Sequence, residues 1–176
     1  MGTTKRMKPK LPRELANVPW ITADGFFDPG QFPIEGPIRQ CCKGGSDEFR
    51  HGCRFLASMA ARGRTDAGIF LLGLLRYHEQ NLAAATTIVE TLGEFADPRC
   101  ADVLVAELHR LPSSNTTRRY LDAVIVALTR LPPSIVGARL RQLADDASFS
   151  YRMRSKFADA AEEVAARASR NHDHGA

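Results

Sequence analysis

The feature that most constrains the fold of this chain is an apolar pattern that recurs every 36 residues. Leu56, Leu92, Leu128 and Val164 form one in-phase column. Five more columns keep the same offset: Cys53, Val89, Ile125 and Ala161; Phe49, Ala85, Leu121 and Phe157; Gly68, Leu104 and Leu140; Leu72, Leu108 and Ala144; Leu75, Leu111 and Ala147. Agreement of six columns predicts a repeat array. The alternative is a helical bundle without a repeat.

From residue 47 onward, apolar residues follow the helical period. The breaks contain Gly, Pro, Ser, Asn or Asp, which cap or stop helices. Seven helices are expected, at 47–61, 65–79, 82–95, 99–111, 116–131, 134–147 and 151–169. Because the connections are short, consecutive helices should be antiparallel. The sequence therefore predicts an all-α fold, a short α-solenoid of helix pairs.

Three regions are expected along the chain. Residues 1–46 form a basic, Pro-rich and irregular extension, residues 47–169 form the repeat domain, and residues 170–176 form a flexible tail. Four aromatic residues in the extension should pack either on the chain's own first helices or on a partner: Trp20, Phe26, Phe27 and Phe32.

The segment TIVETLGEFADPRCADVLVAELHRL resembles a HEAT-like repeat of the short bacterial type. Its first helix ends at residues 91–93, Asp97-Pro98-Arg99 forms a turn, and Leu104 and Leu108 lie on the second helix. The resemblance covers about residues 47–169. It implies a curved helical solenoid that binds other macromolecules. Related repeats serve as adaptors and scaffolds, and also occur in chromophore lyases and in DNA-repair proteins with a basic concave face.

The cysteine spacing does not indicate a metal site. Cys41, Cys42, His51 and Cys53 lie close in sequence, but they form no Cys-x-x-Cys pair. Cys53 belongs to a core column and should point inward. Cys100 begins a helix, where the dipole could lower a thiol pKa, yet a packed, structural thiol is favoured. No metal and no cofactor are predicted.

The remaining motifs predict a protein that is not an enzyme. No Ser-His-Asp arrangement, phosphate-binding loop, dinucleotide glycine pattern or His-Glu-x-x-His sequence occurs. No membrane span is expected, since the apolar run at residues 67–75 has only nine members and a spanning helix needs about 20. Cysteine use indicates a cytoplasmic protein with reduced thiols.

Positive charge gathers in two places, although the net charge is only +4. Residues 1–13 hold five basic groups and no acid, and residues 110–156 hold nine against three. The candidate binding residues are Arg118, Arg119, Arg139, Arg141, Arg152, Arg154 and Trp20. Arg118 and Arg154 are in phase at the 36-residue offset, so the arginines that begin two helices should share one edge. Helix N-termini favour acids over cations, which hints at a bound anion. The alternative is a solvated basic rim, or pairing of these cations with Asp122, Asp145 and Asp146.

These observations predict a non-catalytic adaptor or scaffold that binds another protein, possibly one with an acidic surface. The first alternative is sequence-independent binding of a nucleic-acid backbone through the basic edge and the N-terminal arm. The second is an accessory protein of the lyase type.

Overall fold

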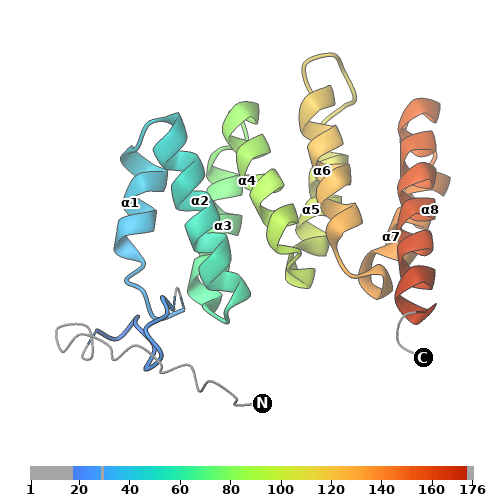
Figure 1. Cartoon of the computed structure of the whole chain (residues 1–176). Helices are drawn as coiled ribbons and strands as arrows, with labels where there is room; N and C mark the ends of the chain where they lie inside the picture. Colours follow the sequence, from blue (N-terminus) through green and yellow to red (C-terminus); the bar gives the residue numbers. More distant parts are fainter. Residues whose placement is uncertain (1–17, 29, 174–176) are drawn as a thin grey trace, which may run out of the picture. The chain divides into compact units, whose positions relative to one another are not determined.

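The computed structural model describes residues 18–28 and 30–173, with the side chains of 171–173 left out, and this part of the chain is helical. It contains eight α-helices, one 3-10 turn and no β-strand; a single bridge joins Ile21 to Phe27. The α-helices are α1 (Glu35–Lys43), α2 (Ser46–Ala61), α3 (Thr65–Tyr77), α4 (Leu82–Phe95), α5 (Ala101–Arg110), α6 (Arg118–Arg130), α7 (Pro133–Asp145) and α8 (Tyr151–Asp173) (Figure 1). The 3-10 turn is η1 (Pro98–Cys100).

The all-α prediction is confirmed, and each of the seven expected helices is present. Helix α4 has the expected bounds, and the other six differ from expectation at one end or both. Helix α1 was not predicted, because it lies in the extension that was expected to be irregular. Helix α8 continues to Asp173, so the first residues of the expected tail are helical. The basic arm at residues 1–13 lies outside the described residues. None of the helices in the described part is both long and apolar enough to cross a bilayer.

The chain divides into two compact units, Met1–Ala67 and Gly68–Ala176. The first unit includes α2, which the sequence analysis assigned to the repeat domain. Helix α3 begins in the first unit and lies mostly in the second.

In the first unit, the segment before α1 packs on α2 through aromatic rings. Trp20 and Phe27 each contact Phe32 edge-on, with ring centroids 5.5 and 5.4 Å apart. Phe32 lies 5.1 Å from Phe55 of α2. Arg64 fixes the same segment, since its Nη1 donates to the carbonyl oxygen of Phe32 at 3.2 Å. Trp20, which is half-buried, therefore packs on the chain itself through Phe32, whereas Phe26 is 71% exposed.

The second unit contains two layers of helices. Helix α6 packs against α4 and α8 in one layer, and α5 and α7 contact each other behind it (Figure 1). Two contacts show that α6 and α8 are parallel. Near their beginnings Lys156 pairs with Asp122, and near their ends Arg167 donates to the carbonyl oxygen of Leu131. These contacts join residues 34 and 36 positions apart. Neighbouring parallel helices are thus related by about the predicted period.

The predicted core columns are largely buried. Leu56, Leu92, Leu128 and Val164 are each at most 3% exposed. Ala147 is an exception: it is exposed, although Leu75 of the same predicted column is buried. Burying one face of each helix in this way supplies the main driving force for folding such pairs.

The turn after α4 follows the predicted motif with one difference. The HEAT-like motif implies a helix end at residues 91–93, whereas α4 continues to Phe95, the end that the helical period predicted. Ala96 ends the helix in the left-handed conformation at φ 49°. The Asp97 carboxylate then accepts from the backbone N–H of Arg99 and pairs with its guanidinium. Gly93 therefore serves packing and not helix termination.

Gly93 brings α4 and α6 unusually close together. A Cβ atom at this position would lie 2.8 Å from the Cα of Ala127 and 3.0 Å from its Cβ. The obstructing atoms belong to the backbone of α6 and to its shortest side chain, so neither can move aside without separating the helices.

We expect Gly93→Ala to lower the free energy of unfolding by about 1–2 kcal/mol, because overpacking outweighs the gain in helix propensity. Urea denaturation measures the change. Gly73→Ala is the matched control: Gly73 is exposed in α3 and no atom lies within 4 Å of its Cβ position. This control should gain about 0.5–1 kcal/mol. Equal effects of the two substitutions would contradict the close approach.

A buried charged network joins α5 to α6. Glu107, which is 8% exposed, accepts from the Tyr120 hydroxyl at 2.5 Å and from Arg110 at 2.6 Å. Arg110 also donates to the carbonyl oxygen of Glu79 at 3.2 Å. Burial, reinforced by the bond to Glu107, raises the pKa of Tyr120 above its ordinary value. Buried charges need such partners to be tolerated.

Tyr120→Phe should lower the free energy of unfolding by about 1–3 kcal/mol, since it removes a hydrogen bond to a buried carboxylate while keeping the ring. Tyr151→Phe, at an exposed position of α8, should change it by less than about 0.5 kcal/mol. Equilibrium unfolding of both variants checks the difference. A neutral Tyr120→Phe would mean that the hydroxyl contributes nothing to the network.

Candidate functional site

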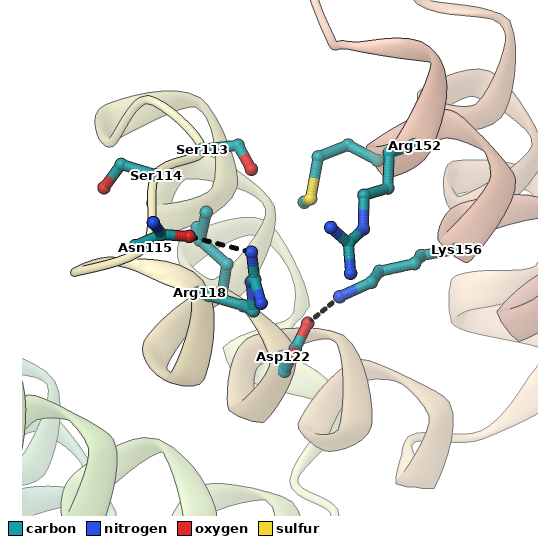
Figure 2. A pocket seen from close by; sticks show the side chains of 9 residues that line it. Ser113, Ser114, Asn115, Arg118, Asp122, Arg152 and Lys156 are labelled. Atoms are coloured by element: carbon teal, nitrogen blue, oxygen red, sulfur yellow. Dashed lines mark hydrogen bonds and ion pairs between the residues drawn. The ribbon is translucent and has the colours of Figure 1, made fainter.

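A polar pocket lies in the second unit, where α6, the loop before it and the beginning of α8 meet (Figure 2). Its volume is about 360 Å³. The lining residues are Ser113, Ser114, Asn115, Arg118, Leu121, Asp122, Arg152, Met153 and Lys156. Leu121 and Met153 are buried and give the pocket an apolar base. Every other lining side chain is polar or charged.

The loop that forms one wall is held by Thr117. Its hydroxyl donates to the carbonyl oxygen of Pro112 at 2.7 Å and accepts from the backbone N–H of Ser114 at 2.9 Å. Thr117 is buried, so these bonds are shielded from water. Such side chain-to-backbone bonds are typical at the start of a helix. The wall is therefore fixed before any ligand enters.

Three cationic side chains converge on the pocket from two helices. Figure 2 shows Arg118 entering from α6, while Arg152 and Lys156 reach toward it from α8. Lys156 pairs with Asp122, whereas Arg118 bonds only to the neutral Asn115 amide at 2.9 Å. The Arg152 side chain makes no hydrogen bond or ion pair with any residue that the structure describes. Three cations and one carboxylate leave a net charge of +2 in the hollow.

Helix geometry explains why Arg118 meets Arg152 and not its in-phase counterpart Arg154. Residues 36 apart point in the same direction from neighbouring parallel helices, so they cannot face each other. Two residues correspond to about 200° around a helix, so residues 34 apart lie on opposing flanks. Arg118–Arg152, Asp122–Lys156 and Gly93–Ala127 all have this separation.

The other predicted arginines do not join this pocket. Arg119 is exposed one position further along α6 and is absent from the lining. Arg154 is half-buried, and its Nε is a buried nitrogen that has no hydrogen-bond partner among the described residues. Their place on one edge with Arg118 and Arg152 stays a prediction, and the pocket itself contains only Arg118 and Arg152 of these four.

Helix α7 carries the last two predicted arginines away from the pocket. Arg139 donates to Asp102 of α5 at 2.7 Å, so it serves an ion pair between these helices. Arg141 lines a different hollow, which is mostly apolar and lies between α7 and α8. Trp20 belongs to the first unit and packs on Phe32.

Apart from Arg118 and Arg152, the polar residues of the pocket were not among the binding residues predicted from the sequence. Lys156 and Asp122 were not included, although their separation of 34 residues equals that of Arg118 and Arg152. This shared offset is the signal that could have identified the cluster. Ser113 and Asn115 carry no comparable signal, because their place depends on the loop conformation.

The cysteines are packed as expected, apart from Cys42. Cys41, Cys53 and Cys100 are buried, and the sulfur atoms of Cys41 and Cys53 lie 3.9 Å apart between α1 and α2. Burial raises the pKa of Cys100 to about 11, so any lowering by the helix dipole is outweighed. Within the described residues, no three His, Cys, Asp or Glu side chains gather as a metal site would require.

Alkylation with iodoacetamide at neutral pH should modify Cys42 first, because its thiol is exposed. Cys100 should react much more slowly until the protein unfolds, since it is buried and its pKa is raised. Mass spectrometry of the digested protein measures both rates. Cys42→Ser should remove the fast reaction, and equally fast labelling of Cys100 would contradict its burial.

Comparisons with models of protein families, with curated proteins and with solved structures found no match to this chain.

Proposed function

We propose that this protein is a non-catalytic adaptor, which binds an acidic segment of a partner protein at the pocket between α6 and α8. The observation that carries the proposal is the guanidinium of Arg152, which faces Arg118 across a hollow with a net charge of +2. Within the described part of the chain, this guanidinium makes neither a hydrogen bond nor an ion pair. Two guanidinium groups held near each other repel. A bound anion would remove that repulsion and gain charge-assisted hydrogen bonds.

The position of the cations at helix beginnings supports an anionic ligand. Arg118 is the first residue of α6, and Arg152 is the second residue of α8. The partial positive charge at a helix N-terminus makes each location unfavourable for a cation by about 0.3–1 kcal/mol. The same partial charge favours an anion that binds there.

A protein ligand fits the arrangement of charge better than a nucleic-acid backbone does. A backbone needs cations along an extended track, but Arg139 is engaged with Asp102 and Arg141 lines a separate hollow. The pocket instead concentrates its charge in one hollow, which suits a side chain inserted end-on. The resemblance of residues 87–111 to a HEAT-like repeat also agrees with binding of a protein.

The proposal is tested with a fluorescent hexaglutamate peptide, whose anisotropy reports binding to the full chain. Arg152→Glu should weaken binding about tenfold or more, because it replaces a hydrogen-bonding cation with a repelling charge. Arg141→Glu makes the same change in net charge on α7, outside the pocket, and should weaken binding less than about twofold.

Equal losses in the two variants would show that net charge alone attracts the peptide, and the pocket would not be the site. A labelled DNA duplex, titrated at the same salt concentration, tests the alternative that the pocket binds a nucleic-acid backbone. If the duplex binds more tightly than the peptide, and Arg152→Glu abolishes that binding, the proposal of a protein ligand would be wrong. Proteins captured from an extract count as partners only if Arg152→Glu loses them and Arg141→Glu retains them.

A further inference from the structure

We propose that the group selected by this pocket is the phosphate monoester of a phosphorylated serine or threonine on the partner segment. The inference rests on the proposed function and names the chemistry of the ligand. It follows from the charge of the pocket, from the directions of its donors and from its limited volume.

The charge of the pocket matches a phosphate monoester better than a carboxylate. Arg118, Arg152 and Lys156 oppose the single carboxylate of Asp122, which leaves +2. A phosphorylated side chain carries about −1.5 to −2 at neutral pH, whereas Asp or Glu carries one negative charge. A carboxylate would therefore leave roughly one positive charge uncompensated in the pocket.

The donors approach the centre of the pocket from several directions. Arg118 comes from α6, Arg152 and Lys156 come from α8, and the Ser113 hydroxyl belongs to the loop (Figure 2). A planar carboxylate is satisfied by one guanidinium fork. The three terminal oxygens of a phosphate monoester spread in three directions and can accept from both helices and the loop together.

The ion pair of Lys156 with Asp122 positions this cation without consuming it. The Lys156 ammonium has three N–H donors, and Asp122 accepts through its Oδ1 atom. Donors remain for a ligand, while the carboxylate holds the amine on the pocket side of α8 (Figure 2). Leu121 and Met153 at the base give the aliphatic part of the ligand an apolar surface.

The limited volume of the pocket selects a terminal group over a group within a chain. A monoester ends in the phosphate and can enter a hollow of about 360 Å³ end-on. This volume lies at the lower end of the range of about 300–1,000 Å³ for small-molecule pockets. A phosphodiester is flanked by substituents on both sides and presents only two free oxygens. The geometry therefore favours a phosphorylated protein segment over a nucleic acid.

The test follows the Arg Nε–Hε signals of the 15N-labelled full chain by NMR during titration with three small probes. The probes are N-acetyl-O-phosphoserine amide, the methyl ester of its phosphate, and N-acetylglutamate amide. The phosphoserine probe should shift the Arg118 and Arg152 signals saturably. Its affinity should exceed that of each other probe by about fivefold or more, since they lose a charge and an acceptor oxygen.

The variants place the effect in the pocket. Arg152→Gln should abolish the saturable shift of Arg118, and Arg141→Gln should leave it unchanged. Both residues are exposed, and unchanged backbone amide spectra would show that each variant keeps its fold. A phosphoserine shift that survives in Arg152→Gln would overturn the assignment of the site.

The remaining outcomes separate this inference from the proposed function. If glutamate binds as well as phosphoserine, phosphate selection is wrong and the acidic adaptor stands. If the methyl ester binds as well, a phosphodiester is an equal ligand and the monoester inference is wrong. If no probe moves Arg118 or Arg152, the inference is overturned, and the hexaglutamate measurement decides the adaptor independently.

Discussion

The second unit depends on the close, parallel approach of helices from successive repeats. At Gly93 the backbone of α4 comes so near to Ala127 of α6 that a single added methyl group would collide with it. Because α6 also lies parallel to α8, with contacts near both ends, the same translation is repeated along the layer. That translation brings the beginnings of α6 and α8 together. The pocket is thus a consequence of how α6 and α8 pack side by side, together with the loop that precedes α6.

The sequence predicted the helical fold well because its evidence was spread over many residues. Four-member columns such as Leu56, Leu92, Leu128 and Val164 were predicted to be core residues, and all four are buried. The nine-residue helix α1 escaped prediction, since it is too short to show a helical period and carries Gly36 and Pro37 in its first turn. Proline is tolerated in the first turn of a helix. The proline content of this segment therefore wrongly indicated an irregular structure. The helix is stabilised by tertiary contact with α2, through buried Cys41 and Pro37.

The site was predicted only in part, and the reason is geometric. Repeat alignment finds residues that are equivalent, such as Arg118 and Arg154, and equivalent side chains point the same way. Residues that meet lie on opposite flanks of neighbouring helices, which shifts their separation from 36 to 34. A sequence gives the phase of each helix but not which flank faces its neighbour. Arg152 and Lys156 could therefore be assigned to the pocket only once α6 and α8 were seen to be parallel neighbours.

The contrast between the pocket and the charged contacts elsewhere in the unit gives the binding proposal its physical basis. Glu107 accepts hydrogen bonds from Arg110 and Tyr120, and Asp102 forms an ion pair with Arg139. These charges therefore have partners within the fold and stabilise it. In the pocket, two guanidinium groups face each other, and Lys156 is the only lining cation that pairs with a carboxylate of the described residues. Arg152 does not need this place for stability, because neither a hydrogen bond nor an ion pair ties its side chain to the described residues. A cation held opposite another cation at a helix N-terminus favours the anion-bound state, which is what a binding site requires.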